Sequence, residues 1–104
     1  MQIFYKEFYQ KALLPIGKKD QQTLESKSSA THCLIAVEGY EDSKKKGYYH
    51  WRVTVYPASS DGNFKSSKPF FSSDQYVTFT DAMEGAKQFM EDGENDQLLS
   101  KYLH

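Results

Sequence analysis

The clearest strand signal in the 104-residue chain is Gly47-Tyr48-Tyr49-His50-Trp51-Arg52-Val53-Thr54-Val55-Tyr56-Pro57. This stretch is rich in aromatic and β-branched residues, as strands are. It also contains the only Trp and the only Arg of the chain. Alternate side chains of a strand point to opposite faces. The face with Trp51, Val53 and Val55 is therefore predicted to line the core, and the face with His50, Arg52 and Tyr56 to lie outside.

A partner strand is predicted at Thr31-His32-Cys33-Leu34-Ile35-Ala36-Val37-Glu38. The polar run 39–47 joins the two strands, which favours an antiparallel hairpin. Only even offsets keep both apolar faces together, because a slip of one residue would turn one of them outward. One allowed register pairs Val37 with Trp51, Ile35 with Val53, Cys33 with Val55, Glu38 with His50, Ala36 with Arg52 and Leu34 with Thr54.

The segments before the hairpin are predicted as a helix and a linker. Apolar residues recur at mostly three- and four-residue spacings in residues 1–14, which favours a helix that Pro15 ends. These residues are Ile3, Phe4, Phe8, Ala12 and Leu13. Residues 16–30 contain one Leu among mostly polar residues. Such a composition buries little apolar surface, so a mobile linker is predicted there.

The second half of the chain is predicted to add one or two strands and two helices. Asp61-Gly62 marks a turn, and residues 64–71 suit a strand that Pro69 would confine to a sheet edge. A short strand at 76–79 leads into a helix at about 81–92, capped by Thr80 or Asp81 and closed by Gly93. Its inner face carries Ala82, Ala86, Phe89 and Met90. A last short helix carries Leu98, Leu99, Tyr102 and Leu103.

These elements predict a single α+β domain over residues 1–104. The sheet is an antiparallel meander of three or four strands with helices packed on one face. The expected order is helix, two strands, an optional strand at 64–71, a strand and two helices. A chain of this length can bury a core of its own, and an aromatic content of 15% favours an ordered fold.

Composition excludes several classes of protein. The single cysteine, Cys33, rules out an internal disulfide and a site of several thiolates. No run approaches the roughly 18 apolar residues of a membrane span, and the N-terminus lacks the order of a secretory signal. We therefore expect a cytoplasmic protein without a membrane contact.

The Cys, His and Gly residues of the sequence form no pattern typical of a catalytic or metal-binding site. Cys33 is predicted on the buried face, whereas His32 and His50 point the other way, so a thiol and a base are not paired. The three histidines, which include His104, do not have helical chelate spacing, and the glycines form no phosphate loop. We expect no enzyme activity, no metal and no cofactor.

The candidate binding surface is the outer hairpin face, defined by Leu34, Glu38, His50, Arg52 and Tyr56. An Arg can bind a carboxylate or phosphate, a His can titrate near neutral pH, and a Tyr can stack. The alternative is an ordinary solvated strand face with a cross-strand ion pair. Leu34 and the neighbouring Ala36 are apolar, which indicates that the N-terminal helix, a second subunit or a ligand covers part of this face.

The preferred function is a non-catalytic protein-interaction or accessory module, whose partner is another protein or a second copy of the chain. One alternative is weak binding of single-stranded nucleic acid through the hairpin, with Tyr48, Tyr49, Tyr56 and Arg52 as a stacking platform. Phosphate contacts would come from Lys44, Lys45 and Lys46. A second alternative is an inhibitor or nucleic-acid mimic that uses the acidic segment 81–96. Residues 53–104 hold four Lys or Arg against eight Asp or Glu.

Overall fold

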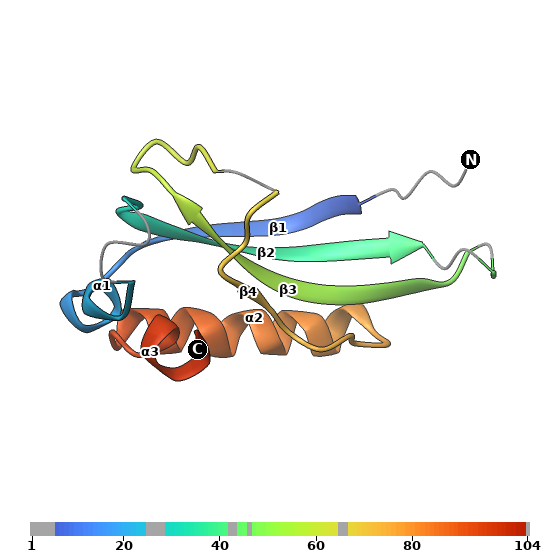
Figure 1. Ribbon diagram of the computed structural model, residues 1–104. Coiled ribbons are helices and arrows are strands. Elements are labelled where there is room, and N and C mark those ends of the chain that lie inside the picture. The colour runs from blue at the N-terminus through green and yellow to red at the C-terminus, as the bar shows by residue number, and fades with distance from the viewer. Residues whose placement is uncertain (1–5, 25–28, 42–43, 46, 65–66, 104) are drawn as a thin grey trace.

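The computed structural model describes residues 6–24, 29–41, 44–45, 47–64 and 67–103. Its elements are β1 (Lys6–Pro15), α1 (Lys18–Leu24), β2 (His32–Glu41), β3 (Tyr49–Ala58), β4 (Phe71–Ser72), α2 (Phe79–Glu94) and α3 (Leu98–Tyr102). The four strands form one antiparallel sheet in the order β1-β2-β3-β4, which is a meander. Figure 1 shows α2 and α3 on one side of this sheet. The predicted α+β class is confirmed.

The first described element is a strand, so the prediction of an N-terminal helix is wrong for residues 6–14. β1 pairs with β2 from Lys6 opposite Tyr40 to Pro15 opposite His32, with a bulge between Phe8 and Gln10. Leu14 packs against the core beneath the sheet, whereas Leu13 packs on the opposite face. Apolar residues on both faces blur the two-residue period of a strand, and their spacing then resembles that of a helix. Ile3 and Phe4 lie outside the described residues.

The segment 16–30, predicted as a linker, contains α1. Leu24 and Asp20 of this helix are buried, although the segment is polar overall. Residues 25–28 of the predicted linker lie outside the described part of the chain. The polar composition of this segment therefore did not reveal that two of its residues are buried and hold the helix in place.

The offset between the two strands of the hairpin is even, as predicted. The register is shifted by two residues from the predicted one. Val37 lies opposite Val53 and Ile35 opposite Val55, so the apolar faces match as expected. β2 extends through Gly39 and Tyr40, which were predicted to lie in the turn. As a result, Glu38 lies opposite Arg52 rather than His50, Ala36 opposite Thr54 and Leu34 opposite Tyr56. Alternation alone cannot choose between even registers.

The core lies between the sheet and α2. Ala82, Ala86 and Phe89 of the helix are buried there with Val53 and Val55 of β3. The helix begins earlier than predicted, because Thr78 is the N-cap and its Oγ1 accepts a hydrogen bond from the Asp81 N–H at 3.1 Å. It also extends beyond the predicted closing Gly93, to Glu94, with Asn95 as C-cap.

The short segments between β3 and α2 only partly match their predictions. The predicted strand at 76–79 is not formed: Tyr76 makes an isolated bridge to Trp51, and Phe79 already belongs to α2. Within 64–71, Phe64 makes an isolated bridge to Ala58, and Phe71 begins β4. The predicted turn is present, with Gly62 at a φ of +87° that suits glycine.

Asp20 of α1 caps the start of α3, and Asp96 in the connection before α3 caps the start of α1. The N–H groups of Leu98, Leu99 and Ser100 donate to the buried Asp20 carboxylate, each at 3.0 Å. In return, the N–H groups of Lys19 and Asp20 donate to the Asp96 carboxylate at 2.8 and 2.9 Å. These bonds provide acceptors for N–H groups that a helix start leaves without intrahelical partners. A Cβ on Gly17 would lie 2.3 Å from Cγ of Asp96, so glycine is needed for this approach.

We expect Asp20→Ala to lower the free energy of unfolding by about 2 kcal/mol, because three helix N–H groups lose their acceptor. Gly17→Ala should also be destabilising, since its methyl group displaces Asp96. Urea denaturation followed by circular dichroism measures both changes. The control is Asp74→Ala at an exposed position, which should change stability by less than about 0.5 kcal/mol. Equal losses for Asp20→Ala and the control would contradict the reciprocal capping.

Candidate functional site

The outer hairpin face is the sheet face opposite α2, and it is largely buried. Leu34, Glu38 and Tyr56 are 5%, 0% and 0% exposed, so the expectation of an outside surface is wrong for them. A second hydrophobic cluster forms here from Leu34, Ala36, Tyr56 and Ala58, with Leu13 and Phe64 packed against it. His50 and Arg52 are half-buried at its edge. The structure brings the predicted residues together, but most of them are buried in the interior.

The centre of this face is the buried carboxylate of Glu38. The hydroxyl of Tyr40 donates to Oε2 at 2.6 Å, and the hydroxyl of Tyr56 donates to Oε1. Burial, followed by the hydrogen bond to Glu38, raises the pKa of both tyrosine hydroxyls well above their usual value. Both tyrosines therefore remain protonated donors near neutral pH.

Arg52 lies beside this group. It is opposite Glu38 in the ladder, and its Cζ is 5.8 Å from the centroid of the Tyr40 ring, within cation–π range. Its Nε is buried without a hydrogen-bond partner among the described residues. Sequence reasoning missed Tyr40 because it assigned this residue to the turn. In an extended strand, a Tyr two residues after a Glu lies on the same face, and this spacing is the signal that could have found it.

The predicted nucleic-acid contacts are only partly assembled. Lys44 and Lys45 are exposed in the β2–β3 connection, and Lys45 Nζ lies 5.7 Å from the centroid of the Tyr48 ring. Lys46 lies outside the described residues. Tyr56 is buried beneath the sheet face and cannot stack on a base without unfolding that face. Tyr48 and Tyr49 are the exposed members of the predicted platform.

A different surface gathers apolar side chains at the hairpin end of the molecule. Among the described residues, the exposed large hydrophobic side chains are Tyr48, Tyr49, Val77 and Phe79. The rings of Tyr49 and Trp51 lie 6.0 Å apart, and those of Trp51 and Phe79 lie 5.0 Å apart. Trp51 also bridges to Tyr76, which precedes Val77. We call Tyr48, Tyr49, Trp51, Val77 and Phe79 the aromatic end; it lies away from α1 and α3 (Figure 1).

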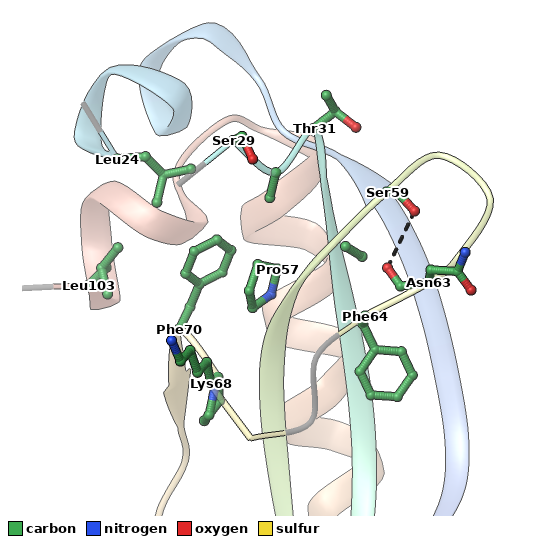
Figure 2. Close-up of a pocket in the computed structure, with 13 residues that line it drawn as sticks. Leu24, Ser29, Thr31, Pro57, Ser59, Asn63, Phe64, Lys68, Phe70 and Leu103 are labelled. Carbon is green, nitrogen blue, oxygen red and sulfur yellow. Dashed lines mark hydrogen bonds between the residues drawn. The ribbon is translucent and has the colours of Figure 1, made fainter. Parts of the chain in front are cut away.

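A pocket of about 780 Å³ opens near α1 and α3, at the other end of the sheet. Figure 2 shows Leu24 and Leu103 on one side of it, Pro57 and Phe70 in the middle, and Phe64 beyond. Among the described residues of the lining, Lys68 is the charged one.

The acidic segment 81–96 is less exposed than predicted. Asp92 is buried and accepts hydrogen bonds from the Tyr102 hydroxyl at 2.9 Å and from Gln88 Nε2 at 3.2 Å. Lys101 Nζ lies 3.5 Å from the same carboxylate. Asp96 caps α1. The carboxylates left exposed on α2 are those of Asp81, Glu84, Glu91 and Glu94.

The single cysteine of the chain belongs to the core. Cys33 is buried on the core face, as predicted, and burial raises the pKa of its thiol to about 12. Within the described ranges, no three His, Cys, Asp or Glu side chains are grouped so that they could hold a metal ion. No helix in those ranges has the length and apolar character to cross a membrane.

We expect Glu38→Ala to lower the free energy of unfolding by about 3 kcal/mol, because two tyrosine hydroxyls on a buried face lose their acceptor. Tyr56→Phe should lower it by about 2 kcal/mol, because the hydroxyl that donates to Glu38 Oε1 is lost. Urea denaturation measures both. The control is Glu41→Ala on the same strand, where the exposed carboxylate accepts a 3.3 Å bond from Tyr49. A loss as large for Glu41→Ala as for Glu38→Ala would contradict the special role of Glu38.

Comparison of the chain with protein-family models, curated proteins and solved structures finds no match.

Proposed function

We propose that this chain is a non-catalytic interaction module that binds another protein through the aromatic end. The observation that carries the proposal is the gathering of exposed large hydrophobic side chains at one end of the described structure, with Tyr48 65% and Val77 79% exposed. Contiguous exposed apolar surface favours a protein contact, whereas scattered apolar residues do not. Trp and Tyr are also the side chains that most often dominate binding energy at interfaces.

The charges beside the aromatic end indicate the chemistry of the partner. Asp74, Asp81 and Glu84 are exposed on the segment that carries Val77 and Phe79. In the part of the chain that the structure describes, their side chains make no hydrogen bond or ion pair. We therefore propose a partner that packs an apolar side chain against the aromatic end and places Lys or Arg residues beside these carboxylates. Complementary charge speeds association and excludes wrong partners.

A second candidate is single-stranded nucleic acid at the same end. Lys44 and Lys45 are exposed next to Tyr48, and a basic loop beside exposed aromatic rings is the arrangement that binds unpaired bases. The carboxylates of Asp74, Asp81 and Glu84 would repel the phosphates, which is why the protein partner is preferred. Titration with labelled single-stranded DNA and RNA at low salt separates the two candidates.

The proposal includes the cytoplasm as compartment and a non-catalytic role. Both are supported by Cys33, a free buried thiol that suits a reducing environment and whose raised pKa keeps it from acting as a nucleophile. A second copy of the chain is the remaining occupant of the aromatic end, and light scattering distinguishes it from another protein.

The test begins with capture of partners from a lysate on the immobilised chain, and continues with the affinity of each identified partner in purified form. The double variant Tyr48→Ser, Val77→Ser should weaken binding at least about tenfold, because exposed apolar anchors are lost while the fold is kept. Gln75→Ser, an exposed polar change on the same segment, is the matched control and should bind as the parent chain does. Asp81→Asn with Glu84→Gln should weaken binding and reduce its dependence on salt.

Two results would contradict the proposal. One is a partner that binds the Tyr48→Ser, Val77→Ser variant as tightly as the parent chain. The other is a dimer in light scattering that the same double variant converts to monomer, which would assign the aromatic end to a second copy of the chain.

A further inference from the structure

The pocket near α1 and α3 lies where β3 loses its neighbouring strand. β4 pairs with β3 only at Thr54 and Val55. The Phe70 N–H donates to the Val55 carbonyl at 2.7 Å. The chain before Phe70 then turns away from β3. Pro57 faces this gap, and a proline has no backbone N–H that would need a partner there. The sheet edge can therefore border an apolar cavity without an unsatisfied backbone donor.

The lining is mostly apolar. It combines β3, the segment before β2, the segment before β4, α1 and the end of the chain after α3. The apolar residues are Leu24, Ala30, Pro57, Ala58, Phe64, Pro69, Phe70 and Leu103. A volume of about 780 Å³ lies within the range of sites that bind small organic molecules.

The polar groups of the lining differ in whether they are already engaged. The hydroxyl of Thr31 bonds to His32, and Ser59 and Asn63 both bond to Asp61. Lys68 differs from them, because its ammonium group has no hydrogen bond or ion pair with any residue in the described ranges. None of the described residues of the lining carries a carboxylate. The net charge of the described lining is therefore positive and is located on Lys68.

We infer that this pocket binds a small amphipathic anion, with an apolar body against Pro57, Phe64 and Phe70 and an acidic head group at Lys68. Burying the apolar body supplies the main part of the affinity. The ammonium group of Lys68 adds charge complementarity and selects an acid over the corresponding neutral molecule. This site lies at the opposite end of the sheet from the aromatic end and does not depend on the proposed protein partner.

The experiment compares dodecanoate with dodecan-1-ol, both below their aggregation limits, by isothermal titration calorimetry on the full chain. Dodecanoate should bind with one saturable site and more tightly than the alcohol. Lys68→Gln should weaken dodecanoate binding about fivefold, the size of a partly exposed charge contact, and leave the alcohol unchanged. Lys87→Gln removes the same charge on the exposed surface of α2 and should change neither affinity.

A second variant tests the location independently of charge. Ser29 is exposed and lines the pocket, so Ser29→Trp should fill the space and abolish binding of both compounds while keeping the thermal unfolding midpoint. Absence of saturable dodecanoate binding would overturn the inference, and so would binding that survives Ser29→Trp. Equal affinity for acid and alcohol, unaffected by Lys68→Gln, would overturn the assignment to an anion.

Discussion

The structure depends on a carboxylate that is buried in the middle of the sheet. Glu38 is 0% exposed, and its two oxygens accept hydrogen bonds from Tyr40 and Tyr56. A buried carboxylate is tolerated only when such partners are in place. Tyr40 lies on β2 with Glu38, whereas Tyr56 lies on β3. The bond from Tyr56 therefore joins the two strands and favours one register. That register places Val37 opposite Val53 and thereby aligns the core on the other face.

Occupation of both sheet faces explains where the accessible apolar groups lie. β2 is buried from Cys33 to Gly39, with α2 on one side and the second hydrophobic cluster on the other. Neither face of this strand is free to bind a partner. The exposed aromatic rings lie at the hairpin end, and the apolar pocket lies at the end that carries α1 and α3. Function is therefore proposed at the two ends of the sheet.

Much of the fold was predictable, because the hairpin has strong local signals. Alternation in β3 identified Val53 and Val55 as core, and small residues identified the inner face of α2. The register was not predictable, because alternation leaves every even offset equivalent. The hydrogen bond from Tyr56 of β3 to Glu38 of β2 favours the observed register, and it became visible only in three dimensions. β1 was missed for a related reason: a strand beside a two-sided core has apolar residues on both faces.

The sequence predicted which residues form the outer hairpin face, but not how deeply they are buried. Glu38, Arg52 and Tyr56 are neighbours on one face. Apolar Leu34 and Ala36 indicated that part of this face is covered, but not that Glu38 and Tyr56 are fully buried. The aromatic end was not predicted, because it combines residues of β3 with Val77 and Phe79. These two residues were predicted to lie in a separate short strand. The pocket needed five separate segments to be placed together. No local pattern encodes such a cavity.

The most direct test of the Glu38 cluster is a spectrophotometric titration of the tyrosines at alkaline pH, with circular dichroism recorded in parallel. Because the pKa of Tyr56 is raised in the folded chain, its stabilising effect is complete below about pH 10 and is lost as pH rises through the raised value. Parent chain and Tyr56→Phe should therefore show equal ionisation near pH 10, and differ by one tyrosine only when the fold is lost. A difference of one tyrosine with a midpoint at about pH 10, in a chain that is still folded, would contradict the account.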